Sequence, residues 1–282
     1  MINIKSWVEK ETNSELKQFR QAIHTILYAI ANSQDLKDIM IMKGGILLAI
    51  QYNSSRYTRD IDFSTSIKFS DFDKDSFLEK FENSLVYAIE TLDYDLDCKV
   101  QSHEVLPSNK PNATTPTFRL KIGYAEKGSN KHKRLLAKNS PNVVQLDYSF
   151  NEITKELDTI KLTDFAVIST YGLVDLVAEK FRAMLQQEVR KRARRQDVYD
   201  LYFLIKNYYS ELKNKEAAIL NSLIEKAASR QLEVEKNSLA QPAIRNRSKL
   251  EYPTLKDEIE GELPDFDEIY NEVNNFYESL PW

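Results

Sequence analysis

Two aspartates, Asp60 and Asp62, lie one residue apart in this 282-residue chain. Side chains at alternate positions of a β-strand point to the same face, so both carboxylates would project to one side. Upstream, an apolar segment at residues 39–42 is followed by Lys-Gly-Gly at 43–45 and a second apolar segment. Adjacent glycines before a helix let backbone N–H groups approach a phosphate closely. Residues 43–63 therefore predict a phosphate-binding turn beside a divalent-metal site.

A third carboxylate, Asp147, falls in a stretch, residues 143–150, whose apolar residues alternate with polar ones. This alternation predicts a strand with one buried face, and Asp147 lies on the polar face. If that strand lies beside the strand of Asp60 and Asp62, three carboxylates converge on one sheet face. Carboxylate oxygens are the ligands that Mg²⁺ prefers, with substrate phosphates and water completing its coordination. The alternative is that the Asp-x-Asp pair is only a solvated strand face.

Composition restricts the classes of protein and of site. The formal net charge is −4, so binding of nucleic acid would need local basic patches. Cys98 is the only cysteine, which excludes an intramolecular disulfide and a thiolate-rich zinc site, and the three histidines are scattered. The N-terminal segment lacks the apolar core of a signal peptide, and no apolar run approaches the ~20 residues of a membrane-spanning helix. We therefore expect a cytoplasmic protein without a membrane partner.

The elements that position these residues divide the chain into two parts. In the first part, period-two alternation predicts three strands that are antiparallel to one another, and helical spacing predicts two helices. The helices are 14–31 and 74–91, the further strands are 96–100 and 118–124, and the polar connections 107–116 and 126–141 are predicted as loops.

In the second part the spacing of apolar residues is helical throughout. The predicted helices are 172–189, 196–209, 214–229 and 265–279, and the Pro-containing stretch 238–264 is predicted as an extended connection. The fold class is therefore α/β (α+β), with a mixed β-sheet core at residues 1–165 and an all-helical C-terminal domain at residues 166–282.

Four blocks of sequence resemble the signature of the AbiEii/AbiGii toxin family of nucleotidyltransferases. They are KGG at 43–45, RYTRDIDF at 56–63, AEKFRA at 178–183 and RQDVYDL at 195–201. The resemblance implies a DNA-polymerase-β-like nucleotidyltransferase core, which transfers a nucleotide from an NTP to an acceptor hydroxyl. Some members are toxins that add nucleotides to the 3′ end of tRNA, paired with a neighbouring antitoxin in abortive phage infection. It thus implies an NTP substrate, a tRNA or other RNA acceptor, a cognate antitoxin and Mg²⁺.

The resemblance also implies roles for individual residues. The implied catalytic residues are Asp60, Asp62, Asp147, Lys180 and Asp197, of which the first three are metal ligands. The implied nucleotide-binding residues are Lys43, Gly44, Gly45, Arg56, Arg59 and Lys180. Two positions depart from the family pattern. Ile46 stands where the family usually has Thr or Ser, which removes a hydroxyl that could touch a phosphate. Gln196 replaces a basic residue before Asp197.

The positions of Lys180 and Asp197 also have a purely structural interpretation. A lysine beside a buried helical stripe can extend its ammonium group to solvent, and an aspartate in a first turn, such as Asp197, is favoured by the helix dipole. Asp200 follows three residues after Asp197 and shares its helix face. The resemblance instead favours a cleft, in which Lys180 contacts the NTP phosphates and Asp197 is an acid beside it.

A basic run precedes the predicted helix 196–209. Five of its six residues are basic, namely Arg190, Lys191, Arg192, Arg194 and Arg195. Such a run is either a solvated helix end or, together with the basic loop at 127–138, a contact for the RNA backbone.

Three other functions remain open. The acceptor of the nucleotide could be a protein, or the chain could be a catalytically inactive binding partner with the same fold. A metal-dependent phosphohydrolase would need more His or carboxylate ligands than the chain offers.

Overall fold

The computed structural model describes residues 4–108, 113–163 and 165–282. Residues 109–112 of the predicted connection 107–116 and residue 164, beside the predicted domain boundary, lie outside the described residues.

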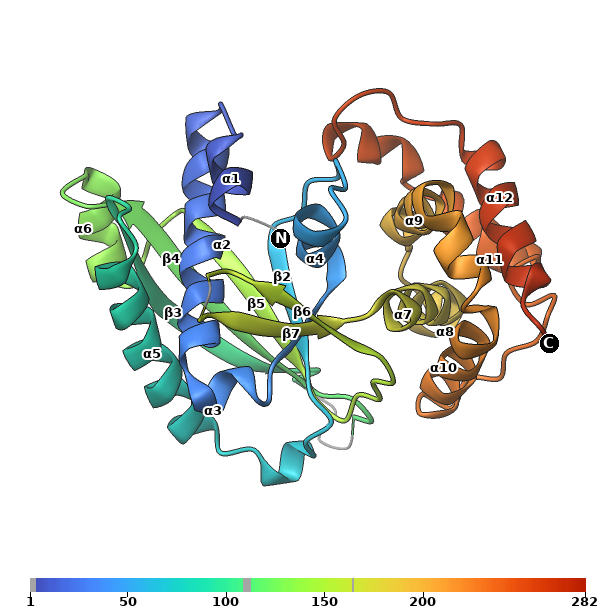
Figure 1. Ribbon diagram of the computed structural model, residues 1–282, viewed down its shortest axis with the longest axis horizontal. Helices are drawn as coiled ribbons and strands as arrows, with labels where there is room; N and C mark the ends of the chain where they lie inside the picture. The colour runs from blue at the N-terminus through green and yellow to red at the C-terminus, as the bar shows by residue number, and fades with distance from the viewer. Residues whose placement is uncertain (1–3, 109–112, 164) are drawn as a thin grey trace. The chain divides into compact units, whose positions relative to one another are not determined.

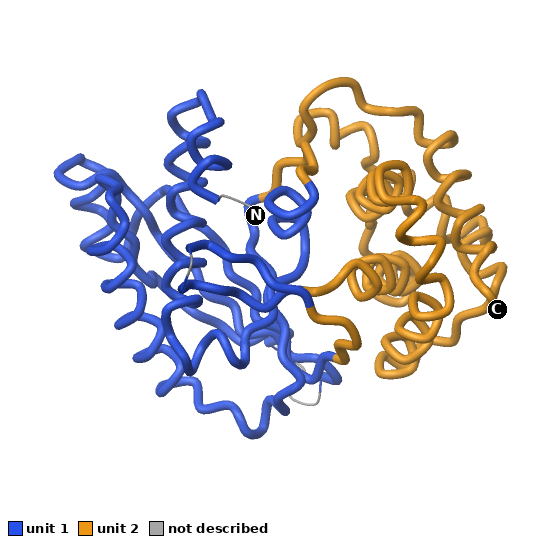
Figure 2. The backbone as a smooth tube through the Cα atoms, in the orientation of Figure 1, with its two compact units in different colours: residues 1–52, 59–152, 158–170 blue, residues 53–58, 153–157, 171–282 orange. Residues whose placement is uncertain are grey.

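The chain forms two compact units, drawn in two colours in Figure 2. Unit 1 comprises residues 1–52, 59–152 and 158–170, and unit 2 comprises residues 53–58, 153–157 and 171–282. Two short segments of the predicted core at residues 1–165, namely 53–58 and 153–157, thus belong to the second unit. One of them carries Arg56, whereas Asp60 and Asp62 lie in unit 1.

Unit 1 contains a mixed sheet, which is seven-stranded in the described residues and has the order β3-β4-β5-β2-β1-β7-β6 (Figure 1). The strands β3, β4 and β5 are antiparallel to one another, as predicted. β5 runs parallel to β2, β2 antiparallel to β1, and β1 parallel to β7. The bounds are β1 Ile41–Lys43, β2 Asp60–Ser64, β3 Leu96–Leu106, β4 Thr117–Glu126, β5 Val143–Ser149, β6 Leu157–Lys161 and β7 Val167–Tyr171.

Helices α2 (Ser14–Asn32) and α5 (Lys74–Thr91) confirm the two helices predicted in this part of the chain. Each begins at a side-chain cap, because Asn13 and Asp73 accept hydrogen bonds from the first backbone N–H groups of α2 and α5. The two helices pack against each other, and α5 covers the apolar face of the sheet, where the ring of Phe77 stacks on Tyr148 of β5 with centroids 5.5 Å apart.

Two predicted irregular segments are wrong because they contain helices. The loop predicted at 126–141 contains α6 (Asn130–Leu136), which Ser129 caps and which buries Leu135. The extended connection predicted at 238–264 contains α11 (Pro242–Lys249) and the 3₁₀ helix η2 (Tyr252–Asp257). Pro242 occupies the first turn of α11, where the missing N–H costs nothing, so this proline begins a helix rather than preventing one.

The four helices predicted in the second part are confirmed as elements of unit 2. They are α7 (Leu173–Leu185) with the short α8 (Gln187–Arg190), α9 (Arg195–Lys213), α10 (Glu216–Ala228) and α12 (Phe266–Ser279). Phe181 of α7 stacks on Phe276 of α12 with ring centroids 6.4 Å apart, which joins these helices in a common core. Elements without a predicted counterpart are α1 (Ile4–Glu9), α3 (Gln34–Lys37), β6 and β7, whereas α4 (Gly44–Gln51) is the helix expected at the glycine turn. In the described part of the chain, no helix combines the length and hydrophobicity of a membrane span.

His24 of α2 provides a test of the unit 1 core. Its Nδ1 lies 2.8 Å from the hydroxyl of Tyr94, and its side chain is buried. Burial, reinforced by the charge of Lys5, lowers the pKa of His24 from 6.5 to about 4. The folded protein therefore holds the neutral ring, and protonation opposes folding.

We expect the unfolding free energy to fall as the pH drops from 6.5 to 4, with His24 accounting for about 3 kcal/mol of the loss. Urea unfolding of wild type and His24→Gln at several pH values measures this. The difference between the two proteins should change across that window and stay level above it. The same comparison with His103→Gln, at an exposed histidine, should give no such change; an equal change in both variants would contradict the assignment to His24.

Candidate active site

One row of paired residues crosses five strands of the unit 1 sheet. Asp62 on β2 is paired with Lys43 on β1 and with Asp147 on β5. Asp147 is paired in turn with Arg119 on β4, and Arg119 with Glu104 on β3. Residues directly opposite each other across strands share a face, so the sheet presents a continuous row of charged side chains. The predicted adjacency of the two aspartate-bearing strands is confirmed.

This row lies on the sheet face opposite α5. Leu146 and Tyr148, on either side of Asp147 along β5, are fully buried on the α5 face. Asp147 and Asp62 are partly exposed, and Asp60 is exposed. Because strand side chains alternate, the core takes one face and leaves the other for polar chemistry.

Asp147 is held by an arginine that is not among the predicted site residues. The Nε of Arg119 lies 2.8 Å from Asp147 Oδ1, and Nη2 lies 2.9 Å from Oδ2. The hydrogen bonds and charge of Asp147 raise the pKa of Arg119. Among the described residues, no three His, Cys, Asp or Glu side chains are grouped so that they could hold a metal ion. The structure thus places Asp147 beside Asp62 without assembling the expected cluster of three carboxylates.

The remaining pair, Asp60 and Asp62, fits Mg²⁺ by its donor chemistry. Both are carboxylates at alternate positions of one strand. Mg²⁺ is commonly held by one or two carboxylates together with substrate phosphates and water, so a protein site does not need three. Mg²⁺ itself, and the role of Asp147 as a ligand, stay predictions.

The helix α4 begins against the Asp62 carboxylate. Gly44 is the first residue of α4 and has a φ of +80°, and a Cβ at this position would lie 2.0 Å from Asp62 Oδ2. Only glycine permits both the backbone conformation and the close approach. The side chain of the preceding Lys43 pairs with Glu152, with Nζ and Oε1 3.0 Å apart. Ile46, the departure from the family pattern, is buried in the core.

Four charged side chains of unit 2 form a separate buried cluster. Lys180 of α7 places its Nζ 2.6 Å from Asp200 Oδ2 and 3.2 Å from Asp197 Oδ1, both on α9. Arg56 binds the other side of Asp200, with Nε 2.7 Å from Oδ1 and Nη2 2.8 Å from Oδ2. The side chain of Asp200 is 0% exposed. Asp200 is therefore the common partner of both cations.

The electrostatics of the cluster keep Asp200 ionised. Burial alone would raise the pKa of this carboxyl, but the charges and hydrogen bonds of Arg56 and Lys180 outweigh burial and lower it to about 2. Burial likewise opposes the charge on Lys180, and the two aspartates outweigh it and raise the pKa of the ammonium. Asp197 Oδ2 is buried and has no hydrogen-bond partner among the described residues, although Arg194 Nη1 lies 3.6 Å away.

The comparisons with known proteins identify the family. The family model described as "Nucleotidyl transferase AbiEii toxin, Type IV TA system" matches residues 25–272. The chain belongs to the AbiEii nucleotidyltransferase toxin family. It is therefore a nucleotidyltransferase of toxin–antitoxin type, and membership implies a cognate antitoxin.

Solved structures are similar over nearly the whole chain. The crystal structure of a Helicobacter pylori protein with a proposed nucleotidyltransferase activity shares the fold, with a TM-score of 0.50, 15% identity and 95% of each chain covered. JHP933 from Helicobacter pylori gives a TM-score of 0.43 at 17% identity, covering 87% of this chain and 95% of its own. MenT4, a nucleotidyltransferase toxin from Mycobacterium tuberculosis H37Rv, gives 0.47 at 14% identity, covering 98% of each chain. No curated protein matches the sequence.

The predicted site residues of this AbiEii-family chain fall into two groups, one in each unit. Asp60, Asp62, Asp147, Lys43, Gly44, Gly45 and Arg59 lie in unit 1, and Arg56, Lys180 and Asp197 lie in unit 2. The nucleotide-binding role of Arg56 stays a prediction, and the structure describes this guanidinium as the buried counter-ion of Asp200. Arg59 is exposed immediately before β2.

The basic run contacts other residues of unit 2 at its C-terminal end. Arg195 contacts Thr254 and Glu258, and Arg194 lies near Asp197. The side chains of Arg190, Lys191 and Arg192 are exposed. Contact of this run with RNA stays a prediction.

Arg119 and Asp200 are not among the predicted site residues, but each contacts at least one of them. Asp200 carried a usable signal, because it shares a helix face with Asp197. Arg119 carried none beyond its place on the polar face of β4, since its partner depends on strand register.

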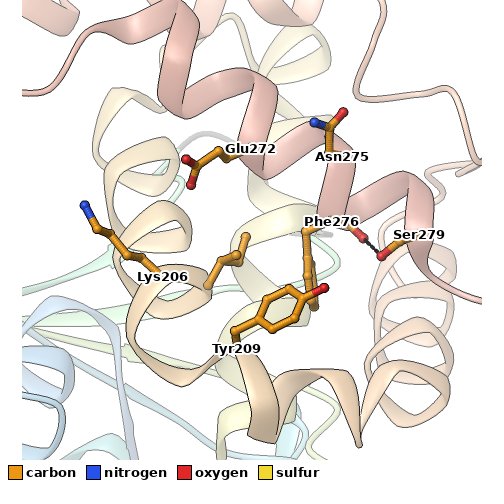
Figure 3. Close-up of a pocket in the computed structure, with 7 residues that line it drawn as sticks. Lys206, Tyr209, Glu272, Asn275, Phe276 and Ser279 are labelled. Atoms are coloured by element: carbon orange, nitrogen blue, oxygen red, sulfur yellow. Dashed lines mark hydrogen bonds between the residues drawn. The ribbon is translucent and has the colours of Figure 1, made fainter.

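Unit 2 also contains a pocket of about 380 Å³ between α9 and α12, shown in Figure 3. Phe276, Ile205 and Tyr209 form its apolar part, and Lys206 and Glu272 are polar groups in its wall. α9 departs from helical geometry at Tyr208, beside this pocket. None of the predicted site residues lines it.

Replacement of Gly44 tests the contact between α4 and Asp62. We expect Gly44→Ala to lose stability, because its φ of +80° is unfavourable for alanine by about 1–2 kcal/mol, and to lose nucleotide transfer, because the methyl group displaces the Asp62 carboxylate. Urea unfolding and transfer of label from an α-³²P-NTP measure the two effects.

Gly128→Ala is the matched control. Gly128 has a φ of +78°, and a Cβ there would meet nothing within 4 Å. This variant should show a similar strain penalty with full transfer activity. Equal activity in the two variants would mean that the Asp62 contact is unimportant for the reaction.

Proposed function

We propose that this AbiEii-family nucleotidyltransferase uses Mg²⁺ to transfer a nucleoside monophosphate from an NTP to the 3′-hydroxyl of tRNA, and that it acts in abortive phage infection. The observation that carries the proposal is the position of the Asp62 carboxylate against the first turn of α4, with Asp60 on the same strand. This arrangement puts hard oxygen ligands next to the backbone N–H groups of a helix start, which are suited to phosphate.

Asp60 and Asp62 would hold the metal with the NTP phosphates. Mg²⁺ supplies charge neutralisation and polarisation of the phosphoryl oxygens. The N–H groups at the start of α4, including that of Gly45, are placed to bind phosphate oxygens. The proposal includes the two roles that the family resemblance implies for residues of unit 2. Lys180 would bind phosphate, and Asp197 would act as an acid.

In the proposed reaction the acceptor hydroxyl gives its proton to solvent water, and its oxygen attacks the α-phosphorus in line. A new P–O bond forms as the bond to the β-phosphate oxygen breaks, and pyrophosphate leaves. Most of the catalysis comes from positioning and from stabilisation of the phosphoryl charge.

The experiment that tests the acceptor incubates the protein with each α-³²P-NTP in the presence of total RNA and total protein from a bacterium. We expect label in the tRNA fraction, with only one or some of the four NTPs. RNA oxidised with periodate, which destroys the 3′-terminal diol, is the matched acceptor control and should take up no label. Label in protein would replace the tRNA proposal with protein nucleotidylation, and label in neither fraction would contradict transfer to both.

A further inference from the structure

Arg119 makes two hydrogen bonds to a carboxylate on this face of the sheet. Its Nε and Nη2 engage both oxygens of Asp147, and Nη1 lies 3.8 Å from Glu104 Oε1. The Nε2 of Gln145, the cross-strand partner of Asp60, lies 3.5 Å from Asp147 Oδ2. The side chains of Arg119 and Asp147 are 26% and 18% exposed, so solvent reaches this pair only partly.

Occupation of both Asp147 oxygens has a consequence for metal binding. A carboxylate that accepts two hydrogen bonds from a guanidinium keeps only two of its about four lone-pair sites for a metal ion. The positive charge of Arg119 also repels a divalent cation at the neighbouring Asp62, and the affinity of oxygen sites for such ions rises with the number of ligand charges. Without nucleotide, the site should therefore hold divalent cations weakly.

A bound nucleoside triphosphate should raise the affinity of the site for divalent cations. Its phosphate oxygens are good partners for an arginine fork, and they compete with Asp147 for Arg119. They also bring metal ligands of their own, so that metal and nucleotide favour each other's binding.

Resting on the proposed function, we propose that Arg119 is a positioning residue that holds Asp147 away from the metal until a triphosphate is present. Divalent metal then enters the site with the NTP rather than ahead of it. Arg119 thus acts on the metal site through Asp147.

A purely structural role for the pair makes a different prediction. Partly exposed ion pairs contribute little to stability. If Arg119 only joined β4 to β5, its replacement would change thermal stability slightly and leave metal affinity unchanged.

The test measures binding of Mn²⁺, as a paramagnetic probe, by the electron paramagnetic resonance signal of the free ion. Wild type, Arg119→Gln and Arg119→Lys are titrated with and without a non-hydrolysable α,β-methylene NTP analogue. Without nucleotide, Arg119→Gln should bind Mn²⁺ about tenfold or more tightly than wild type, and its further gain from the nucleotide should shrink. Arg119→Lys, which keeps the charge but loses the fork, should lie between them.

Lys121→Gln is the matched control. Lys121 lies two positions along β4 on the same face, is exposed, and is paired in register with Gln145 rather than with Asp147. Lys121→Gln removes the same charge as Arg119→Gln. Because solvent screens the exposed Lys121 side chain, the Mn²⁺ affinity of this variant should stay within about twofold of wild type. Circular dichroism checks that all variants are folded.

The outcomes separate this inference from the proposed function. If wild type binds Mn²⁺ with the nucleotide analogue and Arg119→Gln gains no more than Lys121→Gln, the role of Arg119 is wrong and the metal site stands. If wild type takes up no Mn²⁺ even with the analogue, both the metal site and the role of Arg119 are wrong.

Discussion

Replacement of Asp62 by alanine is expected to reduce transfer of label from an α-³²P-NTP by roughly a thousandfold or more, which is the scale of losing a main electrostatic contact to the reacting phosphate. Asp62 lies in the charged row between Lys43 and Asp147, and its carboxylate lies against Gly44. Single-turnover measurement with saturating NTP separates the chemical step from weaker binding.

The stability of the fold should survive this change. Asp62 is partly exposed at the polar face, so its removal creates no large cavity in the core. Asp75→Ala is the control, because Asp75 is also in unit 1 and its side chain is 89% exposed. It should transfer label at the wild-type rate. Wild-type transfer by folded Asp62→Ala would show that the reacting site lies elsewhere.

Replacement of Asp200 by asparagine is expected to cost about 3–5 kcal/mol of stability, because it leaves Arg56 and Lys180 buried without the carboxylate that both cations share. For a protein of this size that corresponds to a fall in Tm of about 10 °C. The pKa of Asp200 is about 2, below the usual 3.8, so its stabilising contribution is complete above pH 3.8 and is lost as the pH falls through 2. At neutral pH the full effect should be seen by thermal unfolding.

Asp267→Asn is a matched control for this cluster. Asp267 also contacts two cations, Arg245 and Lys249, but its side chain is 47% exposed. Exposed ion pairs contribute little, so this variant should unfold close to wild type. If the two aspartate variants unfolded at the same temperature, burial of the Asp200 cluster would not be what stabilises unit 2.

The spacing of apolar residues along the chain correctly predicted many of the helices and strands. The predicted helix 74–91 coincides with α5, and the period-two alternation identified β3, β4 and β5, because these segments each bury one regular face. The spacing did not predict helices that bury only a few residues. α6 buries Leu135 alone, so its amphipathic signal is too weak to distinguish it from a basic loop. The same reasoning mistook Pro242 for a break, although proline is favoured in a first turn.

The sequence by itself determined the Asp60-x-Asp62 pair on one strand, the glycine turn before it, and the resemblance to the AbiEii family. These follow from residues that are close together in the chain, where spacing alone decides which side chains share a face. Only the tertiary structure decided that Arg119 holds both oxygens of Asp147 and that Arg56 pairs with Asp200. The physical reason is that strand order, register and helix packing choose these partners, and they join residues far apart in the chain whose local patterns carry no record of each other.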